Sequence, residues 1–277
     1  MTTNNFMERS VIKTKPQVLF LSHGGGPMPL LGDVGHTEML ACLKSIAADI
    51  RKPSAILVIS AHWEASIPTI TSAAKPPLIY DYYGFPEESY RISYPCPGEP
   101  LLAQQVQASL QKAGIGANCD AQRGFDHGLF IPLKIMYPEA DIPCVQLSLV
   151  DSLNPTEHLN IGRALQNLNY ENLLVIGSGF SFHNLKAFFA PPSSDATAKN
   201  ESFENWLIET CASPDFSEEN RTQRFTQWQN APAARYCHPR EEHLLPLHVC
   251  YGLAETPCSQ HFELQILNKK ASMYLWC

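Results

Sequence analysis

The sequence predicts a single α/β domain, with a central, mostly parallel (mixed) sheet flanked by helices. Short apolar runs alternate with longer segments of helical periodicity, which is typical of this fold class. The 277 residues, 44% of them hydrophobic, can bury one large core, and no break in composition marks a second domain. We therefore expect one domain over residues 1–277, with residues 1–16 as a flexible N-terminal extension.

The elements follow from local patterns. Four apolar runs predict strands, over residues 18–21, 55–60, 142–149 and 173–176. Helical periodicity, with Pro or Asn-Pro at some of the starts, predicts helices over residues 38–50, 101–113, 155–167, 202–211 and 241–251. Residues 187–199, AFFAPPSSDATAK, are too polar and Pro-rich for a core, so we expect an exposed loop or lid there.

Composition excludes several function classes. The net charge of −7 and the absence of a basic run argue against a nucleic-acid partner. No apolar segment approaches a membrane span or a signal peptide, which predicts a soluble, cytoplasmic protein with no membrane partner. Nine cysteines without a CxxC pair fit neither a disulfide framework nor a cysteine zinc site. A small-molecule substrate is the remaining expectation, and the sequence specifies no oligomeric state.

Histidines follow three of the predicted strands. His23 is the second residue of the stretch SHGGGP, His62 follows AILVISA, and His183 follows LLVIGSGFSF. Because open α/β sheets bind ligands at the carboxyl ends of their strands, we expect these three imidazoles to share one site. The glycines after His23 would let the backbone pass close to whatever that histidine holds.

Two further segments supply candidates. HPREEHLLPL resembles the inverted zinc-peptidase motif, but His238 and His243 are five residues apart rather than four, which weakens that interpretation. We expect His243 on a helix, either as a metal ligand or as a packing residue. In RGFDHGLF, Asp126 would orient the imidazole of His127 and raise its basicity. The remaining histidines lack such settings and are expected at the surface or in packing: His36, His158, His248 and His261.

Six blocks together resemble a known family. In order, they are LFLSHGGGP, VISAHW, YDYYGFP, GFDHG, GSGFSFHN and HPREEHLLPL. Their order and spacing are similar to those of the class III extradiol ring-cleavage dioxygenases, in particular the LigB-like branch that includes the 4,5-DOPA extradiol dioxygenases. The resemblance covers nearly the whole chain, from about residue 18 to residue 254.

The resemblance implies an enzyme that opens the ring of a catechol with O₂ at a non-haem Fe(II) site, which zinc can also occupy. By motif, His23, His62 and His243 match the metal ligands. His183 matches a histidine beside the metal that serves either in acid–base catalysis or as an additional ligand. His127 matches a histidine on the substrate side.

Several alternatives stay open at this point. Glu242 is adjacent to His243 and would complete the more usual set of two histidines and a carboxylate. Tyr82, Tyr83 and Phe85 either wall the substrate ring or belong to the core. Cys96 would be an oxidation-sensitive neighbour of this substrate loop, unless it is buried. The same histidines would also suit a zinc hydrolase or amidase, or a metal-binding relative that has lost catalysis.

Overall fold

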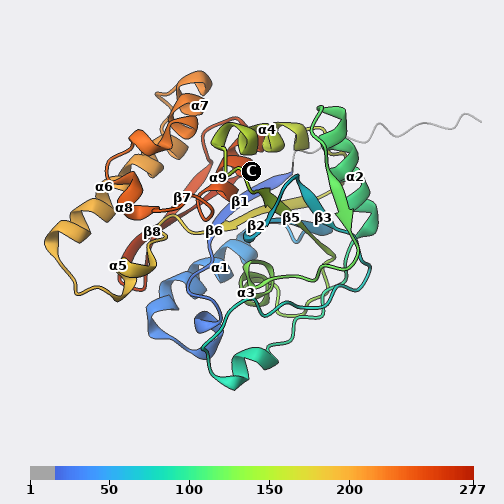
Figure 1. The fold of residues 1–277 in the computed structure, drawn as a ribbon, viewed down its shortest axis with the longest axis horizontal. Coiled ribbons are helices and arrows are strands. Elements are labelled where there is room, and N and C mark those ends of the chain that lie inside the picture. Colours follow the sequence, from blue (N-terminus) through green and yellow to red (C-terminus); the bar gives the residue numbers. More distant parts are fainter. Residues whose placement is uncertain (1–15) are drawn as a thin grey trace, which may run out of the picture.

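A computed structural model describes residues 16–277 as one α/β domain around an eight-stranded mixed sheet (Figure 1). The strand order is β4-β3-β5-β2-β6-β1-β8-β7. The four central strands β5, β2, β6 and β1 are parallel, whereas β8 pairs antiparallel with both β1 and β7. The bounds are β1 (Gln17–Ser22), β2 (Ala55–Ala65), β3 (Thr69–Thr71), β4 (Asn118–Asp120), β5 (Cys144–Val150), β6 (Leu173–Gly179), β7 (Gln260–Ile266) and β8 (Lys269–Trp276).

The predicted fold class is confirmed, and the four predicted strands correspond to these central parallel strands. Their side chains alternate between two cores. Val18 and Phe20 of β1 pack on one face of the sheet, while Leu19 and Leu21 pack on the other. Both faces of the central strands are therefore buried, which is why these strands appear as continuous apolar runs in the sequence.

Helices cover both faces of the sheet. α1 (Thr37–Asp49) and α3 (His127–Met136) lie on one side, and α2 (Pro100–Lys112), α4 (Pro155–Leu165) and α9 (Leu245–Ala254) lie on the other (Figure 1). The second side continues beyond β8 in four more helices: α5 (Leu185–Phe189), α6 (Ser194–Ala212), α7 (Glu218–Thr226) and α8 (Ala234–Cys237). The predicted helices over 38–50, 101–113 and 155–167 are confirmed, whereas α3, α5, α7 and α8 were not predicted.

Two predictions about the later helices were wrong. Most of residues 187–199 are exposed, as expected, but they form the end of α5, a four-residue connection and the start of α6 rather than one long loop. Ser193 caps α6 by accepting a hydrogen bond from the Ala196 N–H at 3.1 Å, so this helix starts well before residue 202. The helix expected over 241–251 begins only at Leu245. Pro246 lacks the N–H that a longer helix would need there, and it sits instead in the first turn of α9.

Other sequence-based expectations concern the termini, the cysteines and the membrane. The predicted N-terminal extension, residues 1–16, lies outside the described residues except for Pro16. All nine cysteines lie within the described part, and each is a free thiol. No helix in residues 16–277 has the length and apolar character that crossing a membrane requires.

Candidate metal centre and substrate cavity

Five histidines gather at the carboxyl ends of the adjacent strands β1, β6 and β2. His23 follows β1 directly, and its N–H donates to the Gly179 carbonyl at 2.9 Å. His62 lies within β2 rather than beyond it, which corrects the prediction. The pairing of β2 with β6 stops at Ser60, and its register with β5 shifts before Glu64. This irregularity turns the strand at His62, as bulges next to functional sites do.

A turn over residues 241–244 positions His243, which is therefore not on a helix as predicted. The carbonyl of His243 accepts a hydrogen bond from the Phe180 N–H at 3.0 Å. A Cβ on Gly179 would lie only 2.1 Å from the same carbonyl oxygen. Only glycine therefore allows β6 and this turn to approach so closely.

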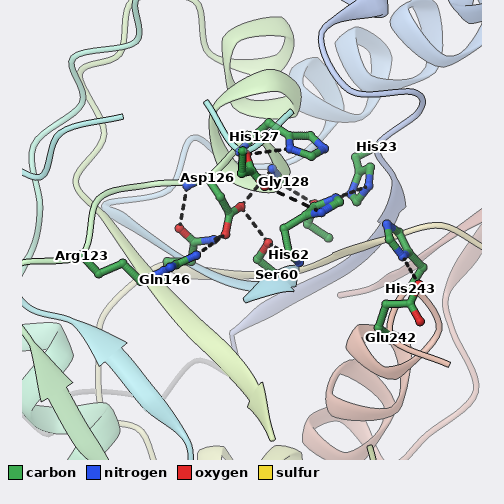
Figure 2. Close-up of polar contacts among 12 residues, drawn as sticks. His23, Ser60, His62, Arg123, Asp126, His127, Gly128, Gln146, Glu242 and His243 are labelled. Carbon is green, nitrogen blue, oxygen red and sulfur yellow. Dashed lines mark hydrogen bonds and ion pairs between the residues drawn. The ribbon is translucent and has the colours of Figure 1, made fainter. Parts of the chain in front are cut away.

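His23, His62 and His243 form the inner part of the cluster. Their candidate ligand atoms all lie within 4.8 Å of one another, and the Nε2 atoms of His23 and His62 are 3.1 Å apart (Figure 2). Two imidazole nitrogens that bind one ion at about 2.1 Å and at right angles lie about 3 Å apart, so the observed spacing fits a shared metal.

The electrostatics of these three histidines favour metal binding. Burial, together with the other histidines of the cluster, lowers the pKa of His23 and of His243 well below the usual value. Burial and the nearby His127 do the same for the pKa of His62, although Asp81 opposes them. The three imidazoles are therefore neutral, which is the form that binds a metal.

The outer nitrogen of His23 has a fixed partner. Ser178 Oγ donates to the Gly128 carbonyl, so the Ser178 hydroxyl must accept the hydrogen bond from His23 Nδ1 at 3.0 Å. This contact leaves His23 Nε2 unprotonated and directed toward His62.

Asp81, rather than Asp126, orients His127. Asp81 Oδ1 accepts hydrogen bonds from His127 Nδ1 at 2.8 Å and from the His127 N–H at 3.0 Å. Its other oxygen lies 3.8 Å from His62 Nδ1. Burial would raise the pKa of Asp81, but the bonds and charge of His127 outweigh it and lower that pKa. Asp81 is therefore an ionised acceptor, and this functional contact was missed from the sequence.

Asp126 has a structural task instead, which corrects the sequence-based expectation. It caps α3 by accepting from the Gly128 N–H at 3.0 Å, and it also accepts from Ser60 Oγ at 2.8 Å (Figure 2). The side chain of Gln146 donates to its second oxygen. Asp126 thereby ties the start of α3, and with it His127, to β2 and β5.

Glu242 supports the opposite side of the cluster. Its Oε1 lies 2.9 Å from His243 Nδ1 and 3.1 Å from His183 Nδ1. The His183 and His243 rings stack with centroids 3.4 Å apart. Burial opposes ionisation of Glu242, but hydrogen bonding and charge from His183 lower its pKa. The carboxylate thus faces the outer nitrogens of two imidazoles, a contact typical of residues that orient metal-binding histidines.

The glycines after His23 form a tight turn held by a buried histidine. Gly24 has φ +80°, and a Cβ there would lie 2.6 Å from Cδ2 of His36. His36 Nε2 accepts from the Gly25 N–H at 3.0 Å, while its Nδ1 lies 2.8 Å from Asp33. His36 is therefore a packing residue, as predicted, and it shapes the turn that lines the site.

The cluster opens into a cavity of about 650 Å³. All five histidines line it, together with the predicted substrate-loop residues Tyr82, Tyr83 and Phe85. Tyr82 is both wall and core, because it is 8% exposed and its hydroxyl donates to the Ser89 carbonyl at 2.6 Å. Cys96 is buried and is not among the lining residues, which argues against an exposed thiol beside the substrate loop.

Comparisons with known proteins identify the family. Residues 18–272 match the model described as the catalytic LigB subunit of aromatic ring-opening dioxygenase. The chain belongs to the LigB family. It is 44% identical to "Dioxygenase tasH" of Hapsidospora irregularis over 86% of this chain and 78% of that protein. It is 39% identical to "4,5-DOPA dioxygenase extradiol" of Beta vulgaris over 86% of this chain and 87% of that protein.

A solved structure supports the same assignment. The crystal structure of an uncharacterised protein of Escherichia coli K12 matches with a TM-score of 0.71 at 28% identity, covering 94% of this chain and 99% of that one. The expectation of an extradiol ring-cleaving dioxygenase of the LigB family is thereby confirmed. The alternative of a zinc hydrolase or amidase is not favoured.

Proposed function

We propose that this LigB-family chain opens the ring of a catecholic substrate with O₂, at an Fe(II) ion held by His23, His62 and His243. The observation that carries the proposal is the 3.1 Å spacing of the Nε2 atoms of His23 and His62 in an aromatic-walled cavity. Imidazole suits iron and zinc alike, so Zn(II) is expected to compete for the same three residues.

The contacts of the outer nitrogens support His23, His62 and His243 as the residues that would hold the metal. The outer nitrogens of His23 and His243 contact Ser178 and Glu242, respectively, which leaves the inner nitrogens as donors. We propose Glu242 as an orienting residue and not as a ligand, because its Oε1 is engaged by the Nδ1 atoms of His183 and His243 and its Oε2 lies 3.5 Å from Nη1 of Arg240. When bound, the metal supplies Lewis acidity toward the catechol oxygens and open positions for substrate and O₂.

His127 and His183 are proposed to move protons. An ionised Asp81 can only accept, so Nδ1 of His127 must donate and its Nε2 is left to take a proton from a substrate hydroxyl. Glu242 fixes His183 in the same way, through the contact at 3.1 Å. The two histidines flank the proposed ligands on opposite sides, His127 beside His62 and His183 beside His243. Each is therefore within reach of a substrate held between them, and each can later return its proton to a leaving oxygen.

The aromatic side chains are proposed to hold the ring. Tyr82 lies edge-on to His127 with centroids 5.6 Å apart, and Phe85 contacts Tyr82 in the same geometry. Such edge-to-face pairs form a rigid apolar wall beside the imidazoles. This wall would keep the catechol ring against the histidine cluster and limit the access of water.

The test is anaerobic loading with Fe(II), followed by addition of a catechol and then of O₂. We expect one O₂ consumed for each catechol opened, with a coloured ring-opened product, and no product from the Zn(II)-loaded protein. Turnover that does not depend on O₂, such as hydrolysis of an ester or amide, would contradict the proposal.

A further inference from the structure

Apart from the histidines, much of the wall of the substrate cavity is apolar. Tyr82, Phe85 and Phe180 form much of this wall. The hydroxyl of Tyr82 donates a hydrogen bond to the Ser89 carbonyl, so the ring of Tyr82 is the part available to a ligand. Among residues 16–277, no Lys, Arg, Asp or Glu side chain lines the cavity.

Three charged residues near the cavity, Asp81, Glu242 and Lys269, are engaged elsewhere, and the exposed Lys186 of α5 is not among the lining residues. Asp81 and Glu242 lie behind the histidines and contact their outer nitrogens. Lys269 follows the lining residue Asn268, but its Nζ lies over the ring of Phe182, 5.8 Å from the centroid. Phe182 is fully buried and is not a lining residue, so this ammonium group does not face the cavity.

The mouth of the cavity is also apolar. Tyr83, Leu185 and Phe189 line it, with exposures of 91%, 60% and 88%. Leu185 and Phe189 are the two ends of α5, and Tyr83 comes from the loop that follows β3. Exposed apolar side chains that gather at one opening are typical of a surface that contacts a ligand.

The size and polarity of the cavity together restrict the substrate. A volume of about 650 Å³ is in the range that proteins use for ligands much larger than a single ring. A carboxylate or ammonium group held against Phe85 and Phe180 would lose its water without gaining a charged partner from this wall. An apolar group of the same size would instead gain from burial.

We propose that the substrate is a catechol with an uncharged, apolar substituent, which lies against Phe85 and Phe180 and reaches the rim of Tyr83, Leu185 and Phe189. This inference rests on the proposed ring-opening function and deepens it. It separates this chain from the relatives named for 4,5-DOPA, because DOPA is an amino acid with a carboxylate and an ammonium group on its side chain.

A matched pair of catechols tests the inference. 4-Propylcatechol and 3-(3,4-dihydroxyphenyl)propionate have chains of equal length and differ in the terminal charge. We expect kcat/KM of the Fe(II)-loaded protein to favour the uncharged member by about tenfold or more, and to be lower still for DOPA. Equal or better turnover of the charged member would overturn the inference.

A binding measurement keeps this inference separate from the proposed function. Anaerobic calorimetry gives the Kd of both catechols whether or not the ring is opened. Failure to open any catechol would overturn the proposed function, while the ratio of the two Kd values would still decide the preference for an uncharged substituent. Tighter binding of 4-propylcatechol by about tenfold supports the inference, and no difference contradicts it.

Variants at the rim provide a gain-of-function test. Leu185→Lys and Phe189→Lys add a cation at exposed positions of α5, where the fold should tolerate it. We expect at least one of them to shift the ratio of kcat/KM toward the carboxylate by about threefold or more, a gain typical of an exposed ion pair. Leu101→Lys is the matched control, because Leu101 is 57% exposed on α2 and lies outside the cavity. If the ratio of kcat/KM for the two catechols stays unchanged in both rim variants, as it should in the control, the inference is contradicted.

Discussion

The close approach of β6 to the turn that carries His243 makes Gly179→Ala a sharp test of the site. The added Cβ would lie 2.1 Å from the His243 carbonyl oxygen, whereas ordinary contact begins at 3.4 Å. The turn must therefore move by about 1 Å, because the packed interior of a protein absorbs little strain. This movement also weakens the hydrogen bond from the Phe180 N–H to the same carbonyl, now 3.0 Å.

The expected effects are on stability and on catalysis. Overpacking of this size costs about 1–3 kcal/mol of the free energy of unfolding. A displacement of about 1 Å at a group that holds the reaction centre lowers kcat/KM by about 100-fold. We therefore expect Gly179→Ala to fold with a lower Tm, to bind less metal and to turn over poorly, as measured by thermal unfolding, elemental analysis and O₂ uptake.

Gly116→Ala is the matched control, because a Cβ at this exposed position meets no atom within 4 Å. It should retain the metal content and kcat/KM of the unmodified protein. If Gly179→Ala retained them too, the geometry assigned to His243 would be refuted.

Two further predictions concern carboxyl groups with hydrogen-bond partners inside the fold. Asp81→Asn removes the charged acceptor of His127 Nδ1, so kcat/KM should fall by about 10–100-fold, and steady-state kinetics should show no such loss for the exposed Asp215→Asn control. Burial raises the pKa of Glu204 from 4.5 to about 7, and its Oε2 accepts from Ser272 Oγ at 2.6 Å. Between pH 4.5 and about 7, the folded protein therefore keeps a proton on Glu204 that the unfolded chain has lost. The free energy of unfolding should fall by up to about 3 kcal/mol as the pH rises through this range. Denaturant unfolding of Glu204→Gln should show a flatter pH dependence, and an unchanged slope would contradict this account.

The central sheet and the gathering of the histidines could be predicted from the sequence for one physical reason. The parallel strands are buried on both faces, so they appear as apolar runs, and their carboxyl ends meet at one edge of the sheet. His23, which follows β1, was therefore located correctly from local pattern alone. β7 was not predicted, because most of its side chains are exposed and carry no continuous apolar signal, whereas β8 was missed although its buried residues 271–276 form a largely apolar run.

Contacts between residues distant in the chain could not be predicted in this way. Asp126 is adjacent to His127 in sequence, yet it caps α3, and the partner of the imidazole is Asp81 from 46 residues away. The motif YDYYGFP contains Asp81 but gives no sign of which histidine it contacts. The late start of α9 had a local signal in Pro246, which marks the first turn of a helix rather than its middle.

The central claim divides the five histidines into three metal ligands and two proton-transferring residues. The most direct measurement is the metal content of five purified alanine variants after anaerobic Fe(II) loading. His23→Ala, His62→Ala and His243→Ala should each lose most of the metal, whereas His127→Ala and His183→Ala should retain it and lose about 10²–10⁴ in rate. Metal retained by His243→Ala but lost by Glu242→Ala would contradict the assignment and indicate two histidines and a carboxylate. Metal lost by His183→Ala would make that histidine a ligand.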